Sequence, residues 1–114
     1  MPLEDRDAAY LWDMLQAARE VVEMMEHHDL AAFLGNRILL RAAERMVEII
    51  GEAAGHVSAS GKETTPDIPW HEIIGQRNIL AHEYGQIDHE LLYKTIVEDI
   101  PELIRRLEKT LPLI

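Results

Sequence analysis

Apolar side chains recur every three to four residues along most of this chain, and that spacing predicts helices. Few β-branched runs occur, and no hairpin dipeptide separates two alternating segments, so strand signals are nearly absent. The first helix is expected from about Asp5 to His27. Its apolar residues form one stripe along a single face: Ala8, Leu11, Leu15, Ala18, Val22 and Met25. An all-α fold is the consequence.

A second long helix is expected to follow Asp29, a residue whose side chain favours the N-cap position. We expect this helix to reach about His56, with a bend near Gly35 and Asn36. Residues 58–67 then gather Gly, Pro, Ser and Asp, the residues of turn chemistry, and are interpreted as a connection.

Two further helices are expected in the second half of the chain. The third has Pro69 at its first position and covers residues 70 to about 82. Asp88 caps the fourth, which runs to about Leu111. Because Pro101 lacks a backbone N–H, it should kink or split this helix. The chain is therefore interpreted as one domain, residues 1–114, built as an up-down helix bundle.

The second helix carries more apolar surface than one core-facing stripe needs. Its apolar residues cover more than one face: Ile38, Leu39, Leu40, Ala42, Ala43, Met46, Val47, Ile49, Ile50, Ala53 and Ala54. A stripe of this width indicates a second buried surface, and a symmetric homodimer is the commonest way to bury one. A helix at the centre of its own bundle would explain the same stripe, and both interpretations stay open.

Composition excludes several classes of function. The chain has no Cys, which removes disulfides, thiolate nucleophiles and thiolate metal sites. Its formal net charge is −10, which argues against binding nucleic acid by bulk electrostatics and favours solubility or docking to a basic partner. The acidic first residues do not form a signal peptide, and no apolar run is as long as a membrane span. We therefore expect a cytoplasmic protein that does not associate with membranes.

One polar stretch near the end of the third helix holds the candidate chemistry. Arg77 is followed five residues later by His82 and then by Tyr84. Arg is a permanent cation whose planar fork grips phosphate, and His exchanges a proton near neutral pH. Arg77 and His82 lie about 140° apart on an ideal helix, so they meet one phosphate only where the helix frays or turns.

These residue types match the needs of RNA cleavage without a metal. A base takes the proton of the 2′-hydroxyl, an acid protonates the leaving 5′-oxygen, and a cation stabilises the extra charge on the phosphate. Two protomers would bring two such His and Arg residues to a shared cleft. The spacing alone occurs by chance in many proteins, and an ordinary helix end, with Arg77 in a salt bridge and Asn78 capping, explains it too.

Longer motifs make the chain resemble the HepT-like branch of the HEPN superfamily, over nearly its whole length. The matching segments are residues 45–54 (RMVEIIGEAA), 68–78 (IPWHEIIGQRN) and 80–84 (LAHEY). The resemblance implies a dimer of four- or five-helix bundles that acts as a metal-independent endoribonuclease toxin. It also implies a nucleotidyltransferase antitoxin that silences the toxin by adding AMP to the Tyr of the Arg-x4-His-x-Tyr motif.

The resemblance assigns a role to each matching residue. Arg77 holds the phosphate of the RNA substrate, His82 carries out acid–base catalysis and Asn78 orients. Tyr84 accepts the AMP. Arg45 and Glu52, seven residues apart on one face of the second helix, are supporting residues that line the same cleft.

The charged residues of the second helix also have interpretations other than the roles that the resemblance assigns. Arg37, Arg41 and Arg45 are spaced to make a phosphate-binding stripe, but Glu44, Glu48 and Glu52 interleave with them, which is typical of a solvated helix face. We expect no metal and no cofactor, because the histidines lack metal-ligand spacing. The net acidity also motivates an alternative function, a non-catalytic helical binding partner of a nucleotidyltransferase.

Overall fold

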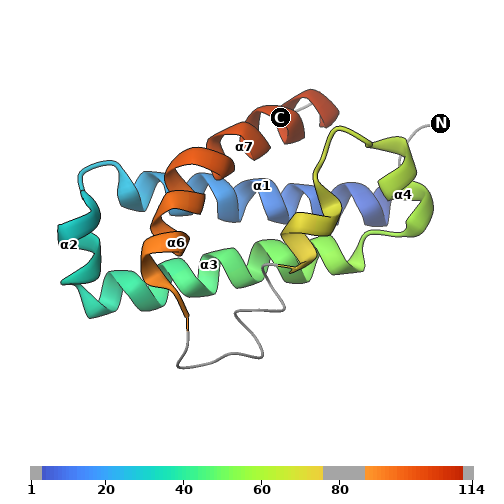
Figure 1. Ribbon diagram of the computed structural model, residues 1–114. Helices are drawn as coiled ribbons and strands as arrows, with labels where there is room; N and C mark the ends of the chain where they lie inside the picture. The colour runs from blue at the N-terminus through green and yellow to red at the C-terminus, as the bar shows by residue number, and fades with distance from the viewer. Residues whose placement is uncertain (1–3, 76–86, 112–114) are drawn as a thin grey trace.

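The computed structural model describes residues 4–75 and 87–111, and all regular secondary structure in these ranges is helical. The all-α class is therefore confirmed. Figure 1 shows the arrangement of the elements along the chain. They are α1 (Asp5–Met25), α2 (Leu30–Leu34), α3 (Arg37–His56), α4 (Ala59–Thr64), a helix over residues 70–75, α6 (His89–Lys94), a π-helical segment η1 (Thr95–Asp99) and α7 (Ile100–Thr110).

The long helices α1 and α3 lie side by side and form the body of the molecule, while η1 and α7 pack against α1 and α6 packs against α2 (Figure 1). The core is made of side chains that α1, α2, α3, α6, η1 and α7 bury completely or nearly so, including Leu11, Leu15, Phe33, Ile50, Leu92, Ile96 and Leu107. Within the described ranges, no helix is long and apolar enough to cross a membrane. The core thus depends on the three- and four-residue spacing that the sequence shows.

The predicted second helix is two helices in the structure. Asp29 caps α2 as expected, since its carboxylate accepts a hydrogen bond from the backbone N–H of Ala32 at 2.8 Å. The predicted bend is a complete break at Gly35 and Asn36, because the Asn36 side chain caps α3 by accepting from the N–H of Leu39 at 3.0 Å. A residue that caps one helix cannot lie inside another.

The predicted connection over residues 58–67 contains a helix, α4, which the turn-rich composition hid. Ser58 starts it, because its hydroxyl oxygen accepts a hydrogen bond from the N–H of Gly61 at 3.0 Å. The same Ser58 donates from its N–H (2.9 Å) and its hydroxyl (2.6 Å) to the buried carboxylate of Asp7 in α1. Residue 58 therefore begins α4 and fixes it to the start of the chain's first helix.

The predicted fourth helix begins after its expected cap, since Asp88 accepts a hydrogen bond from the N–H of Leu91 at 3.0 Å. The helix is divided near Pro101, as predicted, into α6, η1 and α7, and its direction changes between α6 and α7 (Figure 1). The helix widens into η1 just before Pro101, and the N–H of Ile100 bonds to the carbonyl of Thr95, five residues back. A π-helical turn shifts the hydrogen-bond register, which accommodates a residue that has no N–H to donate.

Candidate active site

The four motif residues Arg77, Asn78, His82 and Tyr84 lie outside the described residues. The structure instead defines the two segments that flank the motif and the positions of the two supporting residues on α3. Both flanks pack against the body of the molecule.

The helix over residues 70–75 leads into the motif. Pro69 precedes this helix where the sequence predicted it inside, and its carbonyl accepts a hydrogen bond from the N–H of Ile73 at 3.1 Å. The indole N–H of Trp70 donates to the carbonyl of Thr65 at 3.2 Å, and the Lys62 ammonium lies 5.9 Å from the centroid of the Trp70 ring. Ile73 and Ile74 pack against the core. These contacts fix the approach to the motif.

The other flank begins at Ile87, which is half-buried against the core. Two residues later, the His89 ring lies with its Nε2 atom 2.5 Å from a carboxylate oxygen of Glu44 on α3, and that carboxylate also accepts from Arg41 at 3.1 Å. The pair joins residues 45 positions apart, so no local spacing could reveal it.

Arg45 and Glu52, which the resemblance predicts to support the site, are in contact on the exposed face of α3. The guanidinium of Arg45 lies 3.1 Å from Glu52 and also hydrogen-bonds Glu48. The hydrogen bonds to Glu48 and then to Glu52 raise the pKa of Arg45 further above its ordinary value. The Arg45 side chain remains 55 % exposed. Arg41, paired with Glu44, follows the same pattern, so the interleaved ion pairs expected of a solvated helix face are present.

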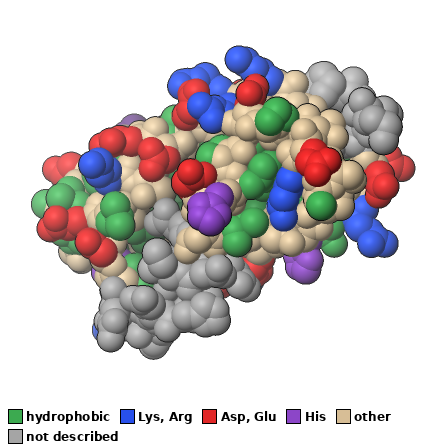
Figure 2. Space-filling model, turned by 45° about the vertical axis from the view of Figure 1, so that its right-hand side comes forward, with side chains coloured by type: hydrophobic (Ala, Val, Ile, Leu, Met, Phe, Trp, Pro, Cys, Tyr) green, Lys and Arg blue, Asp and Glu red, His purple; other side chains and the backbone are tan. Residues whose placement is uncertain are grey.

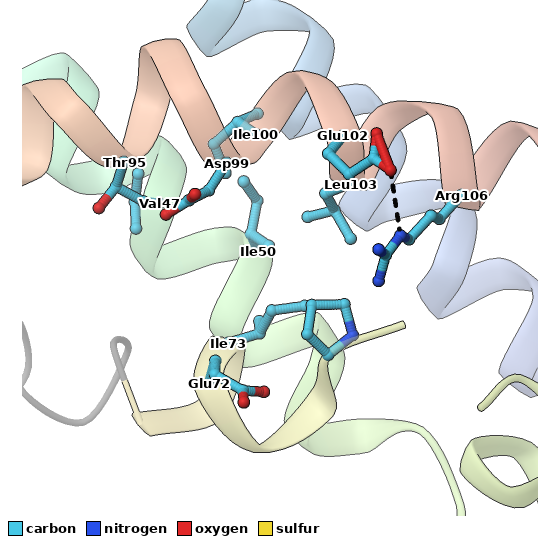
Figure 3. A pocket seen from close by; sticks show the side chains of 11 residues that line it. Val47, Ile50, Glu72, Ile73, Thr95, Asp99, Ile100, Glu102, Leu103 and Arg106 are labelled. Carbon is cyan, nitrogen blue, oxygen red and sulfur yellow. Dashed lines mark ion pairs between the residues drawn. The ribbon is translucent and has the colours of Figure 1, made fainter. Parts of the chain in front are cut away.

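A groove of about 380 Å³, here called the α7 groove, opens beside the helix that leads into the motif (Figure 3). Its floor is apolar and includes Val47, Ile50, Ile73 and Leu103, whereas Glu72, Asp99, Glu102 and Arg106 supply charge. Arg106 lies 3.5 Å from Glu102 and donates to the carbonyl of Asp67 at 2.5 Å. With three carboxylates and one guanidinium in its lining, this groove does not favour a phosphate backbone.

A second groove, the α1–α3 groove, has a volume of about 360 Å³ and lies between the two long helices. Its lining residues come from both: Tyr10, Asp13, Gln16, Ala17, Glu20, Met46, Ile49, Glu52, Ala53 and His56. The Tyr10 and His56 rings stack with their centroids 5.2 Å apart. The supporting residue Glu52 thus borders a groove with an apolar floor.

Charges of both signs are interspersed on the face of the molecule shown in Figure 2, and hydrophobic side chains gather near its centre. This distribution contains no broad basic patch on that face. In the two described ranges, no three His, Asp or Glu side chains are grouped so that they could hold a metal ion.

The sequence of this chain matches the family described as ribonuclease HepT-like over residues 14–110, a span that includes the motif and both of its flanks. The chain belongs to the ribonuclease HepT-like family. Its resemblance to HepT-like proteins is thereby confirmed.

Several relatives align over most of their length. The chain is 39% identical over 100 residues to "Putative RNase MJ1380" of Methanocaldococcus jannaschii, covering 88% of this chain and 92% of that protein. It is 36% identical over 100 residues to "Probable ribonuclease HepT" of Thermococcus cleftensis, covering 88% and 91%. A third relative, "Putative RNase TTE0752" of Caldanaerobacter subterraneus, is 33% identical over 102 residues, covering 90% and 91%. No solved structure matches this chain.

Proposed function

We propose that this chain is a metal-independent endoribonuclease that acts as the toxin of a toxin–antitoxin system. The observation that carries the proposal is the family match over residues 14–110, because it contains the Arg-x4-His-x-Tyr motif at residues 77–84. The names of two relatives, "Putative RNase MJ1380" and "Probable ribonuclease HepT", agree with this proposal. In this proposal the working enzyme is a homodimer of helix bundles, and its substrate is RNA.

The proposed reaction is transfer of the phosphate within the RNA chain. His82 of one protomer takes the proton of a 2′-hydroxyl, whose oxygen attacks the neighbouring phosphorus. The bond from phosphorus to the 5′-oxygen breaks, and a second His82, from the partner, supplies the proton to that oxygen. The products are a 2′,3′-cyclic phosphate and a 5′-hydroxyl. Arg77 stabilises the charge on the phosphate oxygens, and Asn78, Arg45 and Glu52 support the site.

The activity test uses purified protein, a mixed RNA substrate and a chelator. We expect cleavage that persists in the chelator and that falls at least about a hundredfold in Arg77→Ala and His82→Ala, the size typical of a lost acid–base group or charge stabiliser. His71→Ala is the matched control, since His71 is exposed on the helix leading into the motif. Cleavage by His82→Ala at the wild-type rate would refute the proposal.

Silencing is proposed to occur when a nucleotidyltransferase transfers AMP from ATP to the hydroxyl of Tyr84, which loses its proton as pyrophosphate leaves. The chain has three Tyr residues, so the modified one can be identified by single substitution. We expect co-expression with a cognate nucleotidyltransferase to add the mass of one or more AMP groups, and Tyr84→Phe to abolish the addition. Tyr10→Phe is the control. Addition of AMP to Tyr84→Phe would exclude this modification site.

A second candidate function is supported by the net charge of −10, which disfavours binding of a polyanion. In it the chain is a non-catalytic partner of the nucleotidyltransferase. Protein that binds that enzyme, yet cleaves no RNA with or without divalent metal, would favour this candidate. Growth arrest caused by the wild-type chain and abolished by His82→Ala would favour the first.

A further inference from the structure

One hydrogen-bonded pair of side chains connects the segment that follows the motif to α3. The Nε2 atom of His89 lies 2.5 Å from a carboxylate oxygen of Glu44, and Arg41 donates to the same carboxylate at 3.1 Å. Because a carboxylate only accepts hydrogen bonds, the His89 ring donates from Nε2. The Glu44 side chain is 13% exposed, so two donors satisfy a carboxylate that is largely withdrawn from solvent.

The place of this pair in the fold gives it a particular consequence. His89 is the first residue of α6 and directly follows Asp88, which caps that helix. The body of α6 packs mainly against α2 and η1. Among the residues that the structure describes, the pair of His89 and Glu44 is the one hydrogen bond between side chains that joins α6 to α3. It therefore determines where the chain meets α3 after residues 77–84.

This contact differs in kind from the apolar contacts that hold the two flanks of the motif. Ile73, Ile74 and Ile87 pack against the core, and hydrophobic contacts are non-directional. A hydrogen bond between two side chains requires a short distance and a defined angle, so it fixes one relative position of the segments it joins. Glu44 also directly precedes Arg45 in α3. The end of the motif is thus set against the part of α3 that carries Arg45.

We propose that His89 and Glu44 are positioning residues for the proposed RNA cleavage. Their hydrogen bond holds the C-terminal flank of the motif in one register on α3, and so orients Arg77 and His82 relative to Arg45. Neither His89 nor Glu44 touches the substrate. Because a displacement of about 1 Å at a reacting group costs about a hundredfold in rate, a contact outside the site controls kcat. The kinetic part of this inference rests on the proposed function.

The kinetic test compares His89→Ala and Glu44→Ala with the wild type in the RNA cleavage assay. We expect kcat to fall at least about tenfold while KM changes less than about twofold, since a positioning contact acts in the transition state. His89→Gln should recover most of the lost kcat, because its amide N–H can donate to Glu44. A merely structural contact would change the melting temperature and leave the kcat of the folded protein unchanged, and that result would overturn the proposal.

A double-mutant cycle tests whether the two residues act through each other. Glu44→Ala/His89→Ala should lower kcat no further than either single substitution, since each removes the same hydrogen bond. Arg19→Ala is the matched control, because Arg19 and Glu108 form another side-chain pair between distant helices, 2.7 Å apart, that joins α1 to α7. It should leave kcat at the wild-type value. Additive losses in the double variant, or an equal loss in Arg19→Ala, would contradict the proposed role.

Hydrogen exchange separates this inference from the proposed function, because it requires no activity. We expect His89→Ala and Glu44→Ala to speed amide exchange of residues 87–94 at least about threefold, and Arg19→Ala to leave it unchanged. A wild type that cleaves no RNA would refute the proposed activity, and faster exchange in the two variants would still support the anchoring of this flank. Exchange at the wild-type rate in both variants would refute the inference, whether or not the protein cleaves RNA.

Discussion

At the residue scale, the Asp7 carboxylate is the most consequential polar group of the core. It is 2% exposed and accepts two hydrogen bonds from Ser58. The hydrogen bond from the Ser58 hydroxyl, followed by the one from its N–H, lowers the pKa of Asp7 against the opposing effect of burial. The ionised form is therefore favoured by folding, and this residue links stability to pH.

We expect Asp7→Asn to destabilise the fold by about 1.5–3 kcal/mol at neutral pH, the size of a hydrogen bond to a charged group. Because the folded pKa is the lower one, the contribution of Asp7 is complete above the unfolded pKa of about 3.9 and disappears as the pH falls through the folded value. The free energy of unfolding, measured with denaturant between pH 2 and 7, should depend less on pH in Asp7→Asn than in the wild type. Asp13→Asn is the control. The same pH dependence in Asp7→Asn and in the wild type would contradict the linkage.

Two glycines of the same neighbourhood should respond in opposite ways to an added methyl group. A Cβ on Gly61 would overlap the Asp7 carboxylate and touch Val57, whereas a Cβ on Gly55 in α3 would meet nothing within 4 Å. We expect Gly61→Ala to destabilise the protein and Gly55→Ala to stabilise it by about 0.5–1 kcal/mol through helix propensity. Thermal unfolding distinguishes the two signs, and equal shifts would contradict the close approach at Gly61.

At the scale of elements, the break between α2 and α3 depends on one side chain. Asn36 supplies the cap of α3, so Asn36→Ala should cost about 1 kcal/mol and Asn36→Asp should cost little. Urea unfolding of both variants measures the difference. A loss of similar size in Asn36→Asp would show that the amide, and not the acceptor oxygen, is what the position requires.

The helices show which local sequence signals are sufficient to predict where a helix begins. Caps at Asp29 and Asp88 were predicted because one side chain and its own helix determine them. α4 was missed because Ser58 is held by Asp7, 51 residues away, and local composition does not predict a contact over that distance. Pro101 predicted a disturbed helix, but not the π-helical hydrogen-bond register that accommodates it. Contacts between other distant residues, such as His89 and Glu44, cannot be predicted from local sequence patterns either.

The candidate active site also has features that local sequence patterns predict and features that they do not. Its residue types are predicted from the sequence, because the Arg-x4-His-x-Tyr spacing and the longer motifs are local. How Arg77 and His82 meet a phosphate stays a prediction, since both lie outside the described residues. The supporting pair of Arg45 and Glu52 was placed correctly on one face of α3, where the two side chains are in contact.

At the scale of the whole molecule, acidity limits how RNA can bind. A protein with a net charge of −10 repels a polyanion at long range, so few phosphate contacts are expected. We expect kcat/KM for RNA cleavage to fall less than about tenfold between 50 and 200 mM salt, whereas proteins with 6–10 phosphate contacts lose about 10³–10⁵ in affinity. Initial rates at several salt concentrations measure this, and a steeper fall would reveal an extensive basic contact surface.

The bond between Asp7 and Ser58 also bears on how the protein is made. It joins α1 to α4, and both helices have emerged once residue 64 has left the ribosome, when residues 77–84 are still inside it. Since nascent chains fold from the N-terminus onwards, this contact can form before the residues of the proposed chemistry emerge.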